Sequence, residues 1–153
     1  MKIETQQQLD VRNLISFRKS VRATEIQGHI ERLIAYTESQ GAKKVDGGIS
    51  ATYAVDGDKM DIEIYMPIDK EISSTHEFIY KPRLYLENCI KTTHKGNPQL
   101  LDGTIQKMNE HIALNRLTPI SAGFNVTVSE ISNPKELDLF EATIYISLNP
   151  NVV

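Results

Sequence analysis

Two segments of the sequence each place a carboxylate and a tyrosine on one face of a predicted strand. In DIEIY, strand alternation puts Glu63 and Tyr65 on the same side, and in EATIY it does so for Glu141 and Tyr145. Aromatic ring faces attract positive charge by about 0.5–2 kcal/mol, and a partly desolvated carboxylate adds to this attraction. These residue types therefore favour a site for a cation.

A third predicted strand carries the same two residue types, because Tyr85 and Glu87 alternate with Leu84 and Leu86. We predict one acidic and aromatic surface with six ligand-binding residues: Glu63, Tyr65, Tyr85, Glu87, Glu141 and Tyr145. Two alternatives stay open. Carboxylates and tyrosines on an outer strand face are often only solvated surface, and Arg12 would weaken a cation site by pairing with Glu87 across strands.

Catalytic and metal-binding patterns are not found in the sequence. The four histidines lack metal-ligand spacing, and Cys89, the single cysteine, is typical of a small buried apolar residue. Phosphate-loop, dinucleotide and Gly-x-Ser-x-Gly motifs are missing, so we expect no cofactor, no metal and no catalytic residue. A hydrolytic role would need Glu63 or Glu141 as general base and a tyrosine as proton donor, and no spacing supports that arrangement.

Composition and charge narrow the class of protein. The 153 residues are 40% hydrophobic and 24% charged with a net charge of -3, which suits one soluble domain. The basic residues are scattered, which argues against a direct nucleic-acid partner. Apolar runs are too short for a membrane span, and the N-terminus lacks the pattern of a signal peptide. We therefore expect a cytoplasmic protein without membrane contact.

The sequence repeats itself weakly. At an offset of 75 residues Asn13 matches Asn88 and Gly28 matches Gly103, and further on, at an offset of 80, Tyr65 matches Tyr145. The five extra residues are expected within 130–138. We predict a single domain, 1–153, made of two repeats, about 9–70 and 83–150, linked by 71–82.

Each repeat is predicted to contain a strand, a helix and two more strands. Apolar residues recur at helical spacing in both predicted helices: Ile26, Ile30, Leu33 and Thr37, then Leu101, Ile105, Met108 and Ile112. Asn97 before Pro98 is typical of a helix start. Three strands with one helix leave an exposed edge, which pairing two copies would cover. The expected fold is α+β, a joint antiparallel sheet with both helices on one face and a concave groove on the other.

The repeats ending in IEIYMPID and ATIYISLNP, with HKGNPQLLDGTIQKMNEHIALNRL between them, resemble the GyrI-like family, which includes the effector-binding domains of bacterial multidrug-responsive transcription activators. The His94-Lys95-Gly96 run is similar to a family motif. The resemblance implies binding of amphipathic, often cationic small molecules near a glutamate and aromatic rings. Since a helix-turn-helix is missing from these residues, we expect a stand-alone, non-catalytic binding module.

Two other functions remain as alternatives. The chain also resembles an uncharacterised Gram-positive family associated with secreted-toxin gene clusters, which would imply a protein-interaction adaptor or a partner of a secreted toxin. Some GyrI-like relatives hydrolyse reactive ligands, which makes a hydrolase the third hypothesis. A protein partner or a homodimer is compatible with each of these.

Overall fold

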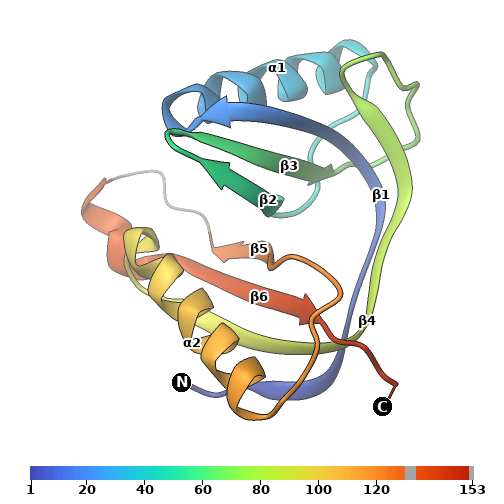
Figure 1. The fold of residues 1–153 in the computed structure, drawn as a ribbon. Helices are drawn as coiled ribbons and strands as arrows, with labels where there is room; N and C mark the ends of the chain where they lie inside the picture. Colours follow the sequence, from blue (N-terminus) through green and yellow to red (C-terminus); the bar gives the residue numbers. More distant parts are fainter. Residues whose placement is uncertain (130–133, 152–153) are drawn as a thin grey trace. The chain divides into compact units, whose positions relative to one another are not determined.

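The computed structural model describes residues 1–129 and 134–151. In chain order its strands and helices are β1 (Glu4–Arg22), α1 (Ile26–Ser39), β2 (Ile49–Asp56), β3 (Lys59–Pro67), β4 (Ile79–Lys95), α2 (Leu101–Leu114), β5 (Phe124–Ser129) and β6 (Glu141–Ser147) (Figure 1). Short 3-10 turns lie at Ala23–Glu25, Pro98–Leu100 and Pro134–Leu139. Within the described ranges the protein is therefore an α+β structure with two helices and six strands, which confirms the expected class.

The chain divides into two compact units. The first-half unit is 10–85, and the second-half unit combines 1–9 with 86–153. Both β1 and β4 contribute residues to each unit. The sequence predicted the segment 71–82 as a linker. Its last residues, from Ile79 onward, already belong to strand β4.

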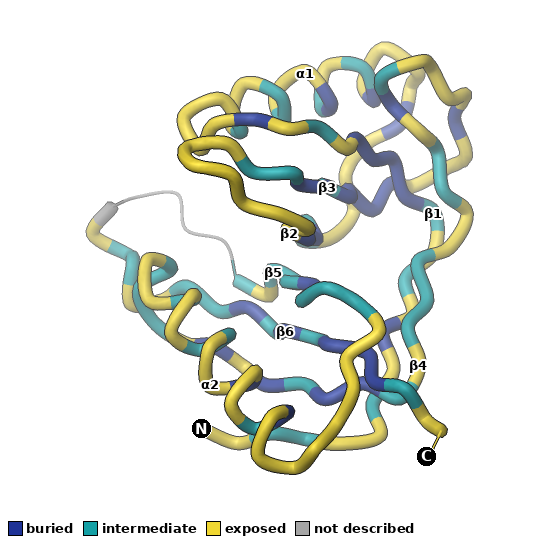
Figure 2. Tube along the Cα trace, in the orientation of Figure 1, coloured by how far each residue is buried: buried dark blue, intermediate teal, exposed yellow. Residues whose placement is uncertain are grey.

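In the first-half unit, β3 pairs antiparallel with β1 on one side and with β2 on the other (Figure 1). The register runs from Leu14 opposite Pro67 to Arg22 opposite Lys59. Leu33 and Thr37 of α1 are buried, as their helical spacing predicts. Figure 2 shows that α1 has both buried and exposed stretches. The core of this unit consists of Ile15, Phe17, Leu33, Ala42, Met66, Ile68, Ile72 and Phe78.

In the second-half unit, β6 pairs antiparallel with both β4 and β5. Met108 and Ile112 of α2 are buried, and Leu101 and Ile105 pack against the same cluster. The core consists of Ile90, Met108, Ile112, Ile144, Ile146 and Leu148. The expected insertion within 130–138 lies partly outside the described residues.

The helix ends follow local rules. The Asn97 side chain accepts a hydrogen bond from the Gln99 backbone amide at 2.9 Å, which confirms the predicted start before α2. Each helix is followed by a residue with positive φ, Gly41 at 77° after α1 and Arg116 at 54° after α2. Such a residue lets backbone amides beyond the helix reach its last carbonyl groups. In the described residues neither helix has the length and apolar composition needed to cross a membrane.

Two asparagines interrupt the strand alternation at matching places. Asn13 in β1 and Asn88 in β4 have positive φ, at 66° and 52°. The side-chain amide of Asn13 donates to the Ile68 carbonyl at 2.7 Å, and that of Asn88 donates to the Leu148 carbonyl at 3.1 Å. Asparagine tolerates this backbone region better than most residues. Buried residues follow each asparagine directly, among them Leu14 and Ile15 in β1 and Cys89 and Ile90 in β4.

Candidate functional site

The best-defined polar site of the first-half unit is centred on Glu63, in the middle of β3. Glu63 is only 8% exposed. A carboxylate removed from water to this extent is costly unless hydrogen-bond donors or opposite charges surround it. Its partners therefore define the chemistry of the site.

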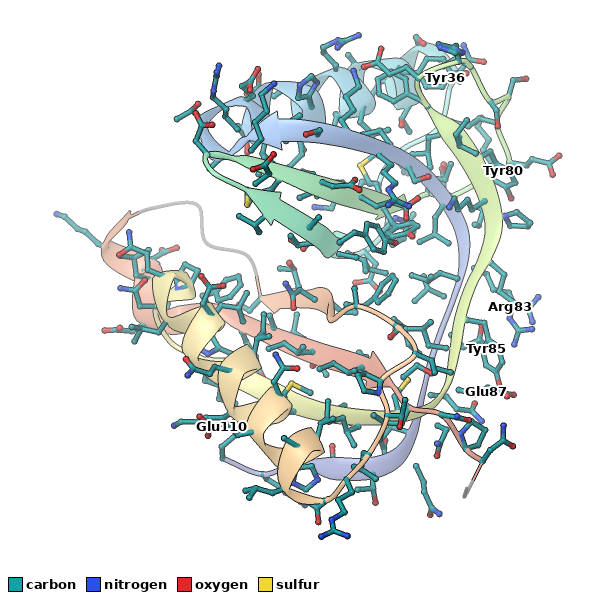
Figure 3. The ribbon with its side chains drawn as sticks, in the orientation of Figure 1. Tyr36, Tyr80, Arg83, Tyr85, Glu87 and Glu110 are labelled. Atoms are coloured by element: carbon teal, nitrogen blue, oxygen red, sulfur yellow. The ribbon has the colours of Figure 1, made fainter. Side chains whose placement is uncertain are left out.

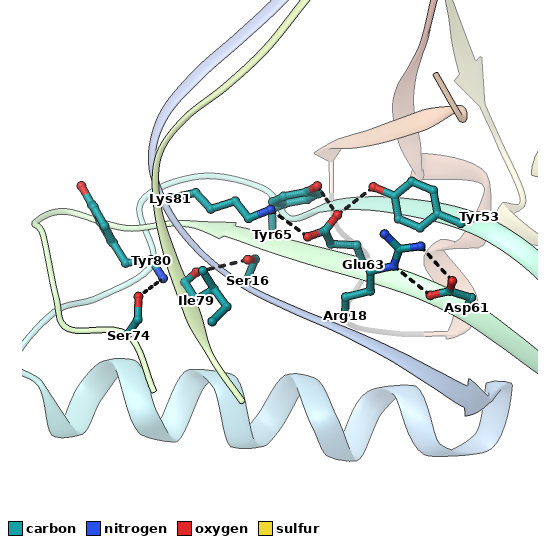
Figure 4. Close-up of polar contacts among 10 residues, drawn as sticks. All are labelled: Ser16, Arg18, Tyr53, Asp61, Glu63, Tyr65, Ser74, Ile79, Tyr80 and Lys81. Atoms are coloured by element: carbon teal, nitrogen blue, oxygen red, sulfur yellow. Dashed lines mark hydrogen bonds and ion pairs between the residues drawn. The ribbon is translucent and has the colours of Figure 1, made fainter. Parts of the chain in front are cut away.

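Three side chains donate to the Glu63 carboxylate (Figure 4). The Tyr53 hydroxyl lies 2.7 Å from Oε1, and the Tyr65 hydroxyl donates to the same oxygen. The Lys81 ammonium lies 2.9 Å from Oε2 and 5.2 Å from the centre of the Tyr65 ring. We call Glu63, Tyr53, Tyr65 and Lys81 the Glu63 cluster.

Three strands position this cluster. Glu63 and Tyr65 are two residues apart on β3, which places both on one face. Tyr53 comes from β2 at an irregularity of the ladder: Thr52 pairs with Ile62 and Ala54 with Asp61, so Tyr53 is the extra residue. Such a bulge re-aims a side chain, here towards the carboxylate. Lys81 comes from the start of β4.

A second charged pair lies next to the cluster. The Arg18 guanidinium binds both oxygens of Asp61, at 3.1 and 2.9 Å, and its carbon lies 4.0 Å from the centre of the Tyr53 ring. The Arg18 guanidinium holds the pKa of Asp61 below its usual value, although partial desolvation acts in the opposite direction. Asp61 is therefore neutralised by Arg18 and remains a separate pair from Glu63.

The protonation states in the cluster follow from its contacts. Burial alone would raise the pKa of Glu63, but the hydrogen bonds from Tyr65, Tyr53 and Lys81 outweigh burial, and the pKa lies below its usual value. Burial and the contact with Glu63 raise the pKa of both Tyr53 and Tyr65. At neutral pH the site is a carboxylate held by two neutral hydroxyl donors and one ammonium.

This arrangement suits binding of charge better than general base catalysis. A general base needs a free lone pair and a pKa near the working pH. Glu63 accepts three hydrogen bonds and has a lowered pKa, so it is a weak base. The tyrosines, with raised pKa values, act as neutral donors.

The structure brings together two of the six residues that the sequence predicted, Glu63 and Tyr65. Tyr85 lies in the same unit, and its ring centre is 4.2 Å from the Arg83 guanidinium carbon. Figure 3 shows Arg83 and Tyr85 leaving β4 on the same side. Glu87 is exposed and belongs to the second-half unit.

The remaining two predicted residues, Glu141 and Tyr145, also belong to the second-half unit. Tyr145 lies opposite Lys91 in the ladder, with the Lys91 ammonium 5.9 Å from its ring centre. In this unit Thr143 pairs with Thr93, whereas in the first-half unit Glu63 pairs with Arg18. At an offset of 80 residues, Thr143 stands where the first half has Glu63.

Sequence reasoning missed Tyr53 and Lys81. The bulge that re-aims Tyr53 has no clear signal in the sequence. Lys81 lay in the predicted linker. If the strand had been predicted to begin at Ile79, in the segment IYKPRLYL, Lys81 would have been recognised as a strand residue that can reach Glu63.

His94 and Cys89 have surroundings that fit structural roles. His94 Nδ1 lies 2.8 Å from the Thr104 hydroxyl and Nε2 lies 3.0 Å from the Asn97 carbonyl, which ties β4 to the start of α2. Cys89 is fully buried, and burial raises the pKa of its thiol. Among the described residues no three histidine, cysteine, aspartate or glutamate side chains form a metal-binding group.

No family model matches the sequence, and no curated protein matches it. Solved structures nevertheless share its fold. The fold is GyrI-like, as the sequence resemblance implied.

Four solved structures of three proteins illustrate the likeness in fold. The C-terminal domain of EcmrR matches with a TM-score of 0.69 and 12% identity over 97% of this chain and 99% of that domain. The structure of EcmrR in complex with DNA matches with a TM-score of 0.70 and 11% identity over 95% of this chain. This chain spans only 57% of the length of that EcmrR chain. SAV2435 bound to tetraphenylphosphonium matches at 0.62 and 12% identity over 98% of this chain and 95% of that one. A hydrolase from Listeria innocua matches at 0.62 and 10% identity over 97% and 91%.

Proposed function

We propose that the protein is a non-catalytic module that binds an amphipathic organic cation at the Glu63 cluster. The observation that carries this proposal is the buried Glu63 carboxylate, which two tyrosine hydroxyls orient while the Tyr65 ring already faces an ammonium. The carboxylate supplies the countercharge, and the ring supplies a face for cation–π contact. Partial burial strengthens both interactions relative to water.

The fold supports this choice of ligand class. SAV2435, which shares the fold, was solved bound to tetraphenylphosphonium, a large aromatic cation without a hydrogen-bond donor. A hydrolase also shares the fold, but the lowered pKa of Glu63 and its engaged oxygens do not favour hydrolysis here. For the interaction adaptor, the described residues offer no comparable feature.

We further propose that the chain arose from a duplicated strand, helix, strand, strand unit and that only the first copy has a cation site. The matching positive-φ asparagines, Asn13 and Asn88, support the duplication. Thr143 at the place of Glu63 supports a single site. A joint sheet with a groove remains a prediction, as do ligand roles for Tyr85, Glu87, Glu141 and Tyr145.

The proposal is tested by calorimetric titration with tetraphenylphosphonium. We expect one site per chain, and we expect Glu63→Gln to weaken binding at least tenfold, about 1.4 kcal/mol, because the countercharge is lost. Tetraphenylborate, with the same shape and opposite charge, should not bind. Glu141→Gln is the matched control and should bind like the unmodified protein.

Two results would contradict the proposal. Equal binding of tetraphenylphosphonium and tetraphenylborate would show that apolar contact alone drives association. Unchanged affinity in Glu63→Gln, with loss in Glu141→Gln, would move the site to the second-half unit. If a panel of aromatic cations neither binds nor raises the melting temperature, a pull-down for a protein partner becomes the next experiment.

A further inference from the structure

Lys81 makes both contacts that the Glu63 cluster would offer to a ligand. Its ammonium is 2.9 Å from the Glu63 carboxylate and 5.2 Å from the centre of the Tyr65 ring. We infer that Lys81 is a tethered competitor: it occupies the cation site of the ligand-free protein, and an organic cation binds by displacing it. This inference rests on the proposed function and adds how the site is regulated.

The charges around the site require an exchange. With Lys81 in place, Glu63 is neutralised, and Asp61 is neutralised by Arg18. A further cation at the carboxylate would face the Lys81 ammonium at close range without a free negative charge to offset the repulsion. Once Lys81 leaves, the incoming cation replaces it one for one.

The geometry permits Lys81 to leave. Its side chain is 36% exposed, whereas that of Glu63 is 10% exposed. A lysine head on a flexible four-carbon stem can turn into water, where an ammonium is strongly hydrated. Tyr53 and Tyr65 keep donating to Glu63 Oε1, so the carboxylate stays oriented during the exchange.

The exchange also selects the ligand. Lys81 donates a hydrogen bond to Glu63, and a phosphonium or quaternary ammonium cannot replace that bond. Such a ligand must compensate through apolar and aromatic surface, which a small cation lacks. We therefore expect tetraphenylphosphonium to displace Lys81 and tetramethylammonium to fail at the same concentration.

The first test compares Lys81 variants by titration with tetraphenylphosphonium. Lys81→Met keeps an unbranched apolar side chain and removes the competitor, so binding should tighten at least tenfold. Lys81→Arg should bind more weakly than the unmodified protein, because a guanidinium holds a carboxylate with two hydrogen bonds. Lys91→Met, which removes a lysine over a tyrosine ring in the second-half unit, should have no effect.

The second test needs no variant. Lysine acetylation, followed by mass spectrometry, should label Lys81 more slowly than the exposed Lys59 in the free protein, because its ammonium is held by Glu63. Saturation with tetraphenylphosphonium should accelerate labelling of Lys81 several-fold and leave Lys59 unchanged. Slower labelling of Lys81 in the complex would overturn the inference.

The outcomes separate the inference from the proposed function. If the unmodified protein binds, Lys81→Met binds no tighter and Lys81 labelling does not accelerate, the inference fails and the proposed function stands. If only Lys81→Met binds, the inference stands and the unmodified protein is not a receptor for this cation. If neither binds and circular dichroism shows both folded, both proposals fail.

Discussion

At the scale of single residues, the tyrosine partners of Glu63 determine how the cluster responds to pH. The two tyrosine partners stay neutral because ionising either would place a phenolate against a carboxylate. Burial and this contact raise the pKa of Tyr65 above its usual value of 10.0, and Tyr53 is affected in the same direction. The contribution of the cluster to the free energy of unfolding should therefore change at alkaline pH.

We expect the free energy of unfolding to fall as pH rises above about 10, the ordinary tyrosine pKa. The folded protein holds the Tyr65 proton more tightly than the unfolded chain, so below that pH the contribution is fully present, and above it unfolding releases a proton. Tyr65→Phe should reduce this dependence. Denaturant unfolding at several pH values measures it.

Ionisation of the tyrosines can also be followed by ultraviolet absorbance, because the chain has six tyrosines and no tryptophan. Tyrosinate absorbance should show that Tyr65 resists ionisation in the folded protein and ionises when the protein unfolds, and Tyr65→Phe should remove that final step. Tyr145→Phe, in the second-half unit, is the control and should leave it in place. A final step that survives in Tyr65→Phe would contradict the assignment.

About half of this cluster could be predicted from sequence. Glu63 and Tyr65 follow from strand alternation, since residues two apart on a strand share a face. Tyr53 depends on a bulge and Lys81 on how early β4 begins, and both are set by strand pairing over long sequence distances. Local patterns carry little information on such pairings.

At the scale of elements, helices were predicted better than strand faces. The buried residues of α1 and α2, Leu33 with Thr37 and Met108 with Ile112, match the helical spacing. Alternation alone does not account for β1, where Leu14, Ile15, Ser16 and Phe17 are buried in succession.

Arg116 offers a test of the helix ends. It takes a positive φ of 54° after α2, where α1 is followed by Gly41 at 77°. This conformation is strained for a residue with a Cβ, so Arg116→Gly should stabilise the protein by about 0.5–1 kcal/mol after the extra chain entropy of glycine is counted. Denaturant unfolding measures the change.

The reverse substitution is the control. Gly41→Ala should destabilise the protein by a similar or larger amount, since a Cβ there is strained and would also lie 3.3 Å from the Lys70 ammonium. Stabilisation by Gly41→Ala, or destabilisation by Arg116→Gly, would contradict this account of the helix ends.

At the scale of the whole molecule, the second-half unit is completed by the start of the chain. Leu9 is 4% exposed, the Thr92 hydroxyl donates to the Lys2 carbonyl at 2.6 Å, and Lys91 lies 3.6 Å from Glu4. The sequence repeat did not predict this, because residues 1–9 precede the matched positions.

Leu9→Ala should therefore destabilise the second-half unit more than the first-half unit. Removing a buried leucine side chain costs about 2–5 kcal/mol. Hydrogen exchange should show lost protection in β4 from 86 onward and in β6, with smaller changes in β2 and β3. Leu33→Ala, in the core of the first-half unit, should give the opposite distribution.

The division of the chain also sets an order of events during synthesis. Residues 10–85 are contiguous, so the ribosome can release a complete first-half unit while α2, β5 and β6 are still unmade. Residues 1–9 precede the first-half unit in the chain, whereas their partners Lys91 and Thr92 follow it. The segment 1–9 therefore cannot make these contacts until residues 91 and 92 have also been synthesised.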